Sequence, residues 1–416
     1  MAKRIDEICS HVPHVDVKQI PSSNPIYGAA VYRCETTREA DQLLAGEVEG
    51  YVYQRDGHPN ADVLAEQCRQ LHGAEKAIVT SSGMAALSLA VLSLLRQGDH
   101  LLVSDRLYGR STKLFQHEFP RWGLETTAVD FCDLEKIAAG MRGNTKMLVV
   151  ETISNPLLRV ADLTGISELA RQQNALLLVD NTFATPAVCK PILCGADLVM
   201  ESVSKMMNGH SDLMLGMLCG SNRVWDRVRS VCAAWGFTSS PQDCWLASRG
   251  LSTLHLRIKR ACDNARLLAR ALKESPHVQH VCYPGDAADT SHSIATRLFE
   301  TSQTKVASRP ESVQTATGNN VAVPDLLYGN MVTFRLPNDR NLADRFISAA
   351  KEIAFFPSLG DVVTTISHPL STSHRHLSSS EQVALGIDEG TIRVSVGIES
   401  AEFVLESFRH ALLTLD

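Results

Sequence analysis

Several features are missing from this 416-residue chain. None of its 11 cysteines stands in a Cys-x-x-Cys pair, the spacing typical of zinc ribbons and thiol redox motifs. We therefore expect no metal site, and reduced, mostly buried thiols of the kind found in the cytoplasm. A basic excess is also missing, since the formal net charge is -6, which argues against a nucleic-acid partner.

Long hydrophobic runs are absent as well. The most apolar stretch, residues 85–95, is broken by serines and closed by Arg96, well short of the roughly 18 residues of a membrane span. The start of the chain, MAKRIDEICSHVPHVD, has no apolar core, so we expect no secretory signal. The hydrophobic fraction of 44% and charged fraction of 21% are those of an ordinary globular protein. The length allows two domains.

The stretch from 176 to 216 carries the strongest chemical signal. A short apolar run at 176–179, typical of a buried parallel strand, ends in Asp180. A second run at 196–200 leads to Lys205, which lies among small hydroxyl residues before a polar turn. An acid beyond one strand and a lysine beyond the next are what a pyridoxal phosphate (PLP) enzyme needs. The alternative is that Asp180 caps a helix and Lys205 is an ordinary loop lysine.

Strands alternating with helices over residues 61–220 predict a mostly parallel sheet, whose ligands bind beyond the carboxyl ends of the strands. After the strand 77–80, the turn Ser82-Gly83-Met84 opens a helix, an arrangement that can bind an anion. Tyr108 follows the strand 101–103, where a tyrosine can lie against an aromatic cofactor or take part in proton transfer.

Two further segments lie outside this predicted sheet. Residues 1–60 are expected to form an N-terminal arm that packs on a neighbouring subunit. Within it, Tyr53 and Arg55 are two apart and could reach one anion, although they could equally be an exposed loop pair. We expect a large domain at 61–250 and a C-terminal domain at 251–416, the latter with a polar, flexible insertion at about 286–326.

Arg393 stands alone among apolar residues of a predicted strand near the C-terminus. An arginine in such a place usually has an anionic partner, either a structural carboxylate or the carboxylate of a bound substrate.

Taken together, these motifs closely resemble the Cys/Met-metabolism family of PLP enzymes, which includes cystathionine γ-lyase, γ-synthase and β-lyase, methionine γ-lyase and O-acetylhomoserine sulfhydrylase. The resemblance runs from about Tyr51 to the C-terminus, apart from the tract 286–326. It implies an α/β fold of the PLP-dependent aminotransferase type (fold type I), with a large, mostly parallel-sheet domain and a smaller α+β C-terminal domain. It also implies PLP as the cofactor and a homodimer or homotetramer with shared active sites.

The resemblance also implies roles for particular residues. Lys205 would bind the cofactor covalently and move protons, Asp180 would pair with the ring nitrogen, and Tyr108 would stack on the ring. The phosphate would be held by Ser82, Gly83, Met84, Ser202 and Ser204, with Tyr53 and Arg55 of the neighbouring subunit. The substrate would be bound by Asn155, Ser358 and Arg393, the last through the α-carboxylate.

Some positions depart from the family pattern. Val363 stands where many lyases have a glutamate, and Arg110 stands where small residues or cysteine are common, so that it narrows the site or binds a distal carboxylate. We interpret the chain as an enzyme of γ-elimination or γ-replacement, like cystathionine γ-lyase or γ-synthase. The alternatives are an O-acetylhomoserine sulfhydrylase, a cystathionine β-lyase, or a PLP-binding protein without turnover.

Overall fold

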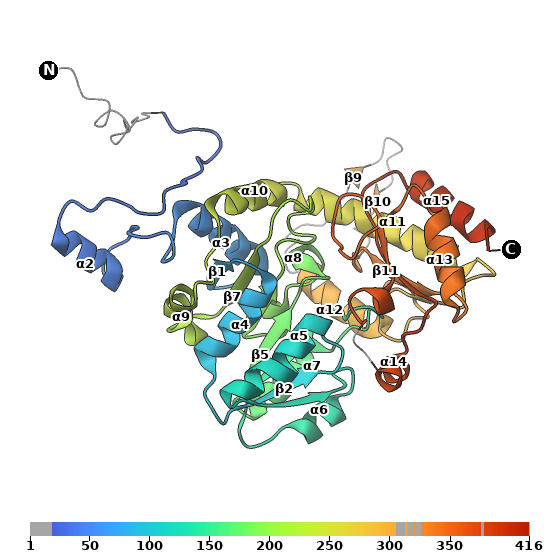
Figure 1. The fold of residues 1–416 in the computed structure, drawn as a ribbon, viewed down its shortest axis with the longest axis horizontal. Helices are drawn as coiled ribbons and strands as arrows, with labels where there is room; N and C mark the ends of the chain where they lie inside the picture. The colour runs from blue at the N-terminus through green and yellow to red at the C-terminus, as the bar shows by residue number, and fades with distance from the viewer. Residues whose placement is uncertain (1–18, 305–312, 315–319, 322–325, 376–377, 416) are drawn as a thin grey trace.

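The computed structural model describes residues 19–304, 313–314, 320–321, 326–375 and 378–415. Two β-sheets organise these residues (Figure 1). The first sheet has the strand order β1-β7-β6-β5-β4-β2-β3, and the second has the order β12-β13-β14-β11-β8. The strands of the first sheet are β1 (Lys76–Thr80), β2 (His100–Ser104), β3 (Glu125–Val129), β4 (Thr145–Glu151), β5 (Leu176–Asp180), β6 (Leu198–Glu201) and β7 (Gly216–Gly220). Those of the second are β8 (His280–Cys282), β11 (Met331–Arg335), β12 (Ala354–Phe355), β13 (Thr365–Ser367) and β14 (Thr391–Ser395). A separate pair is formed by β9 (Val313–Gln314) and β10 (Asn320–Val321).

The first sheet is mostly parallel, which confirms the predicted α/β architecture. The strands β3, β2, β4, β5 and β6 run parallel to one another, and β7 is antiparallel to both β6 and β1. The carboxyl ends of β1 and of these five parallel strands therefore lie at one edge. A strand that is buried on both faces needs a continuous run of apolar residues, and β5 is such a strand. Leu177 and Val179 pack into one core cluster, whereas Leu178 packs into another on the opposite face.

Helices cover both faces of this sheet, as the ribbon shows (Figure 1). The helices are α2 (Thr37–Ala45), α3 (Pro59–His72), α4 (Gly83–Leu94), α5 (Gly109–Lys113), α6 (Leu134–Gly140), α7 (Leu163–Gln172), α8 (Thr185–Val188), α9 (Val228–Trp235), α10 (Pro241–Leu251), α11 (Leu254–Lys273), α12 (His292–Thr304), α13 (Arg340–Ala349), α14 (Ser379–Leu385) and α15 (Ala401–Leu413). Short helical turns are η1 (Leu114–Glu118), η2 (Phe119–Trp122), η3 (Pro191–Cys194), η4 (Asn222–Val224) and η5 (Pro369–Ser371).

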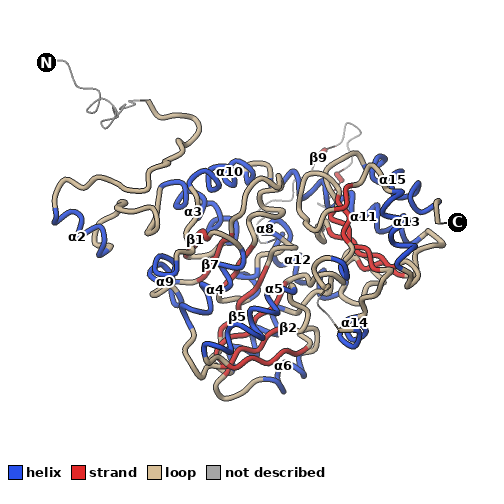
Figure 2. The backbone as a smooth tube through the Cα atoms, viewed as in Figure 1, coloured by secondary structure: helices blue, strands red, loops and turns tan. Residues whose placement is uncertain are grey.

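The second sheet has its own core, built with α11, α13 and α15. Phe334 of β11 packs edge-to-face on Phe346 of α13 and on Phe408 of α15, with ring centroids 5.3 and 6.3 Å apart. Figure 2 shows the strands of the two sheets as two separate groups in the chain. The second sheet lies beside the edge of the first at which the parallel strands end, and the candidate site forms there.

Part of the predicted insertion is not a flexible surface segment. Residues 292–304 form α12, and the side chains of Ala295, Leu298 and Phe299 are buried in the core below the first sheet. Their spacing places one apolar stripe on a helix that is otherwise rich in serine and threonine, so the polar composition concealed the pattern. The stripe packs near α8 and η3. Residues 305–312, 315–319 and 322–325 of the same tract lie outside the described residues.

The arm contains a helix that its polar sequence did not suggest. The helix α2 begins after the N-cap Thr36 and ends at Gly46, which adopts a left-handed conformation. None of its residues is buried, and Figure 1 shows this segment projecting away from the body of the chain.

In the described part of the chain, no helix is both long and apolar enough to cross a membrane.

Candidate active site

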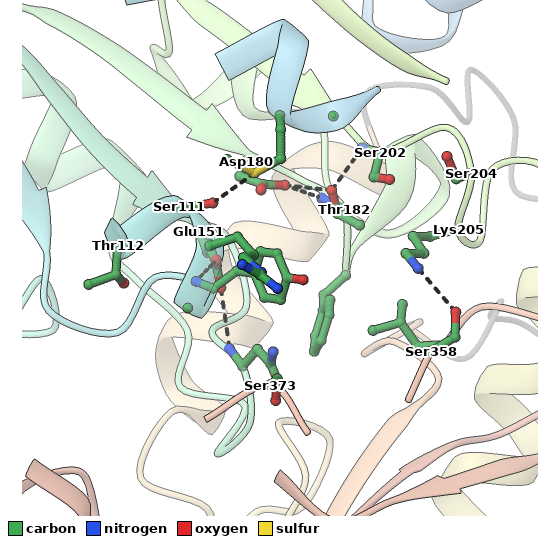
Figure 3. A pocket seen from close by; sticks show the side chains of 18 of the residues that line it. Ser111, Thr112, Glu151, Asp180, Thr182, Ser202, Ser204, Lys205, Ser358 and Ser373 are labelled. Atoms are coloured by element: carbon green, nitrogen blue, oxygen red, sulfur yellow. Dashed lines mark hydrogen bonds between the residues drawn. The ribbon is translucent and has the colours of Figure 1, made fainter. Parts of the chain in front are cut away.

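A cavity of about 1220 Å³ lies at the carboxyl edge of the first sheet, facing the second sheet (Figure 3). It brings together residues from at least six separate segments of the chain. The predicted site residues that line it are Ser82, Gly83, Met84, Tyr108, Arg110, Asn155, Asp180, Ser202, Ser204, Lys205, Ser358 and Arg393.

Asp180 lies at the end of β5 and is held by its neighbour Thr182. Its Oδ1 accepts hydrogen bonds from the Thr182 backbone N–H at 3.0 Å and from the Thr182 hydroxyl at 2.6 Å (Figure 3). The same hydroxyl oxygen accepts a bond from the backbone N–H of Ser202 at 3.0 Å. Burial raises the pKa of Asp180, and the two bonds from Thr182 oppose that rise. Thr182 therefore holds the Asp180 carboxylate in position as a hydrogen-bond acceptor. Burial disfavours the charged form of this carboxylate unless a cation lies opposite it.

Glu151 is a site residue that the sequence reasoning missed. It ends β4 beside Asp180, which is its partner in the sheet register. Its Oε1 accepts from the backbone N–H of Tyr108 at 2.6 Å, and its Oε2 accepts from the backbone N–H of Asn155 at 3.3 Å. Burial and the negative charge of Asp180 raise its pKa well above the usual value. The sequence did contain a signal for Glu151, because this residue follows an apolar run directly, as Asp180 does.

Lys205 projects into the cavity opposite Asp180, and its Nζ donates a hydrogen bond to the Ser358 hydroxyl at 3.0 Å (Figure 3). Burial lowers the pKa of Lys205, and the positive charge of Arg393 lowers it further. The turn that carries Ser358 lies close to the lysine because Gly360 has a φ of +84° and no side chain. A Cβ at this glycine would lie 2.5 Å from the backbone nitrogen of Met206.

The amino end of α4 faces the same cavity. Ser82 caps the helix by accepting a bond from the backbone N–H of Ala85 at 3.1 Å, and the first two residues of the helix, Gly83 and Met84, line the cavity. A Cβ on Gly83 would lie 3.1 Å from the Cβ of Ser202, so glycine allows the two segments to approach. The Ser204 hydroxyl lines the cavity but already donates to the carbonyl oxygen of Leu215 at 3.1 Å. This corner is suited to binding a phosphate.

Arg393 approaches from β14 of the second sheet and is almost completely buried, with 4% of its surface exposed. Its Nη1 donates to the Asn155 side-chain oxygen at 2.9 Å, and its Nη2 donates to the Ser358 carbonyl oxygen at 3.1 Å. Burial lowers its pKa to about 10. Its Nε–H has no acceptor among the described residues. These contacts are to neutral oxygens, which leaves the cation available for a ligand carboxylate.

Four cationic or titratable side chains gather on the outer part of the cavity: Arg110, Lys113, His117 and Arg375. The first three come from α5 and η1, whereas Arg375 comes from the segment after η5. All four are exposed, and none forms an ion pair with a carboxylate of a described residue. Of this group the sequence reasoning had named only Arg110, because the others become neighbours only in the fold.

Tyr53 and Arg55 do not line the cavity of their own chain. They lie on the arm, where the guanidinium carbon of Arg55 is 5.4 Å from the centre of the Tyr53 ring. Both residues are exposed.

A buried polar group also lies behind Asp180. The side-chain amide of Asn181 donates to Glu201 at 2.7 Å and to the carbonyl oxygen of Cys189 at 2.9 Å, and its oxygen accepts from the Thr152 hydroxyl at 2.7 Å. The Nε2 of His72 is 3.4 Å from Glu201. Burial raises the pKa of Glu201 well above its usual value and lowers that of His72 to about 3, so burial disfavours the charged form of both groups. The sequence reasoning had assigned no role to this pair.

Comparison with known proteins decides the family. A model of Cys/Met metabolism PLP-dependent enzymes matches residues 11–317 and 314–413. The chain belongs to this family. Cystathionine γ-lyase of Bacillus subtilis is 34% identical over 398 residues, covering 95% of this chain and 96% of the relative. O-succinylhomoserine sulfhydrylase of Pseudomonas aeruginosa is 33% identical, covering 94% and 90%. L-methionine γ-lyase of Fusobacterium nucleatum is 32% identical, covering 93% and 92%.

Solved structures agree with this family assignment. Cystathionine γ-synthase from Xanthomonas oryzae, in complex with aminoacrylate and cysteine, superposes with a TM-score of 0.84 at 31% identity, over 94% of this chain and 93% of that chain. The chain is therefore a PLP-dependent enzyme of sulfur amino acid metabolism with the fold predicted from its sequence.

The cavity of this family member fits the cofactor. It offers a buried lysine amine at Lys205, an acid at Asp180 on the facing strand end, and a helix amino end suited to a phosphate at Gly83. The requirements for the amine, the ring nitrogen and the phosphate of PLP are thus met within one cavity.

Proposed function

We propose that this enzyme acts at the γ-carbon of an L-amino acid whose leaving group ends in a carboxylate. O-Succinyl-L-homoserine and L-cystathionine both have this chemistry, whereas O-acetyl-L-homoserine and L-methionine do not. The observation that carries the proposal is the group of four unpaired side chains, Arg110, Lys113, His117 and Arg375, on the outer part of the cavity. Three of them, Arg110, Lys113 and Arg375, are cations without an ion-pair partner among the described residues, and such cations at the mouth of a cleft favour an anionic ligand group.

The substrate would be held at both ends. Arg393 binds the α-carboxylate, kept in place by the Asn155 amide and the Ser358 carbonyl. Arg110 and Arg375 bind the distal carboxylate near the cavity mouth. An arginine can bind a carboxylate through two parallel hydrogen bonds, so the contact fixes the orientation of the substrate as well as adding affinity. Between the two ends, the α-carbon would lie near Lys205 and the γ-carbon further out.

Bound PLP supplies the electron sink that makes the α-proton acidic. The cofactor would be held by Lys205 covalently, by Asp180 at the ring nitrogen and by Tyr108 on the ring face. Its phosphate would be bound by Ser82, Gly83, Met84, Ser202 and Ser204.

The residues of the chain would then carry the proton transfers. Lys205 Nζ takes the α-proton and delivers it onward, and burial and the charge of Arg393 lower its pKa, which favours the unprotonated amine that this role needs. Ser358 holds this amine through its hydroxyl group. The leaving group departs from the γ-carbon, and either elimination to a 2-oxo acid or replacement by a thiol follows.

We further propose that the working unit is at least a homodimer, in which Tyr53 and Arg55 reach the phosphate of the neighbouring subunit. The arm exposes large apolar side chains, which an isolated chain would leave in water. Exposed fractions are 97% for Ile20, 65% for Val31 and 63% for Leu44. Apolar side chains this exposed on one projecting segment favour a protein partner that covers them. The free thiols of the described residues support a cytoplasmic location.

The test is a comparison of four substrates with the purified holoenzyme, following 2-oxobutyrate release and, with L-cysteine or sulfide present, thioether or thiol formation. We expect kcat/KM for O-succinyl-L-homoserine or L-cystathionine to exceed that for O-acetyl-L-homoserine and L-methionine by about 10-fold or more, the worth of a charge-assisted hydrogen bond. Arg110→Gln should remove most of this preference, and Arg96→Gln, an exposed cation outside the cavity, should not. Equal turnover of all four substrates would contradict the distal-carboxylate proposal, and no turnover of any would contradict the proposed reaction.

A further inference from the structure

A second cavity, of about 640 Å³, lies on the C-terminal sheet away from the site described above. Its walls come from β8, β11, the end of α11 and the loop that follows β4. Polar or charged side chains that line it are Arg159, Lys273, Gln279, His280, Asp286, Asp289, Thr290, Thr333, Arg335 and Thr391. Neither the family nor the proposed reaction assigns a role to it.

Two arginines of this cavity have donors without acceptors. The buried Nε–H groups of Arg159 and Arg335 have no hydrogen-bond partner among the described residues. A buried donor left unpaired costs about 1–3 kcal/mol, so each such group calls for a partner such as water or an ion. Arg393 shows the same feature in the first cavity, where a substrate carboxylate is expected. The parallel indicates that the second cavity also takes an anion.

The charges around this cavity leave Arg159 without a counter-ion. Lys273 is paired with Asp286 at 2.5 Å, and Arg335 has only a long contact of 3.7 Å with Asp388. The carboxylate of Asp289 accepts bonds from the backbone N–H groups of Tyr283 and Ser291. No carboxylate of a described residue is within ion-pair distance of Arg159. A bound anion would therefore supply Arg159 with the ion-pair partner that the described residues do not.

The two arginines reach one cavity from separate elements, since Arg335 ends β11 and Arg159 lies in the loop after β4. Cys282 also lines this cavity, and the positive charges of both arginines oppose the rise in its pKa that burial and the charge of Asp289 cause.

We propose that this second cavity is a binding site for a small anion bearing a carboxylate or phosphate group, held between Arg159 and Arg335. The site is suited to a soluble metabolite rather than to a macromolecule, because its walls enclose a volume in the range of small-molecule pockets.

The location of this cavity links it to substrate binding. Thr333 lines the cavity and donates a hydrogen bond to the Pro156 carbonyl oxygen at 2.6 Å. It is also the direct neighbour of Arg393 across β11 and β14. Asn155, which precedes this proline, is the partner of Arg393. An anion held by Arg159 would brace the loop 155–159, so we expect its binding to change KM more than kcat. This last expectation rests on the proposed function.

Direct binding is the first test and needs no substrate. Isothermal titration of the holoenzyme with citrate, and separately with inorganic phosphate, would be done at constant ionic strength set with sodium chloride. We expect one anion bound per chain. Arg159→Gln and Arg335→Gln should each weaken binding by about 10-fold or more, the loss of a charge-assisted bond. Lys351→Gln removes an exposed charge from the same domain and should leave binding unchanged.

The outcomes separate the alternatives. Tighter binding of citrate would indicate a carboxylate ligand, and tighter binding of phosphate would indicate a phosphorylated one. Binding lost in Arg393→Gln but kept in Arg159→Gln would place the anion in the active site and overturn the proposal. The proposal also fails if neither anion binds at millimolar concentration. Two independent variants keep the test valid if one of them does not fold, as checked by circular dichroism. Because binding is measured without turnover, its failure is distinct from failure of the proposed reaction.

Discussion

The carboxylate of Glu151 accepts a hydrogen bond from the backbone N–H of Tyr108, with 2.6 Å between oxygen and nitrogen. Its second oxygen accepts from the N–H of Asn155. One buried side chain thereby fixes two loops of the site, one carrying the proposed ring-stacking tyrosine and the other carrying the partner of Arg393. We regard Glu151 as a positioning residue.

Glu151→Ala should therefore lower kcat/KM by about 10- to 100-fold, because two buried N–H groups lose their acceptor at about 1–3 kcal/mol each. Glu151→Gln should lose less, since the amide oxygen can still accept from the Tyr108 N–H, whereas the NH2 group would face the Asn155 N–H without accepting from it. Steady-state kinetics with a circular dichroism check would measure both. An equal loss in the two variants would contradict the role of the Tyr108 contact, because only Glu151→Gln keeps an acceptor for it.

Glu201, the buried acid behind Asp180, should make the stability of the cofactor-free protein depend on pH. Burial raises the pKa of Glu201 above 4.5 in the folded state, so between 4.5 and the folded pKa only the unfolded state loses the proton. The free energy of unfolding should then fall as pH rises, by up to about 1.4 kcal/mol per pH unit for one group. Glu201→Gln should make this fall less steep.

Urea unfolding at several pH values between about 5 and 8 would test this expectation. Glu352→Gln, which changes an exposed acid, serves as the matched control. An identical slope in Glu201→Gln and the unchanged protein would contradict the raised pKa.

Arg393→Lys should raise KM for any amino acid substrate. Lysine cannot reproduce the bonds of the guanidinium to Asn155 and Ser358, and weakening a buried charged contact costs about 2–5 kcal/mol. Arg393→Gln also removes a positive charge that lowers the pKa of Lys205, so the basic group in the pH profile of kcat, which reports the enzyme–substrate complex in which this amine is free, should titrate at higher pH. A profile that does not move in Arg393→Gln would show that the two cations are not coupled.

Gly83→Ala should weaken cofactor binding. The added Cβ would lie 3.1 Å from the Cβ of Ser202 and 3.2 Å from its Cα, and such crowding typically costs about 1–3 kcal/mol. Titration of the apoenzyme with PLP, followed by visible absorbance, would give the dissociation constant. Gly143→Ala is the matched control, since a Cβ there meets nothing within 4 Å. Equal affinity in both variants would contradict the proposed phosphate position.

Mixed oligomers test the proposed role of the arm. Lys205→Ala and Arg55→Gln chains should each have little activity alone. When they are unfolded and refolded together, hybrid dimers should contain one site with both native residues, so activity should partly return. No recovery in the hybrids would place Arg55 in a role within its own chain.

The sequence by itself determined the main chemical features of the first sheet. Asp180 ends its strand and Lys205 lies four residues beyond Glu201, which ends the next one, so short-range patterning placed both near a strand end. The Ser82-Gly83 turn before α4 could likewise be recognised from residues that are neighbours in the sequence. The helix α12 was missed because three apolar residues among many serines and threonines form a stripe only when wound into a helix.

Only the tertiary structure decided which distant residues meet. Arg393 and Asn155 are 238 residues apart in the chain, and their contact exists because β14 faces the loop after β4. The same packing brings Arg375 and Arg110 to one cavity and Arg335 and Arg159 to another. Periodicity indicates which side of a strand or helix is apolar, whereas the pairing of two elements depends on how their surfaces fit. The proposed substrate preference and the proposed second anion site therefore depend on the packing of the two sheets.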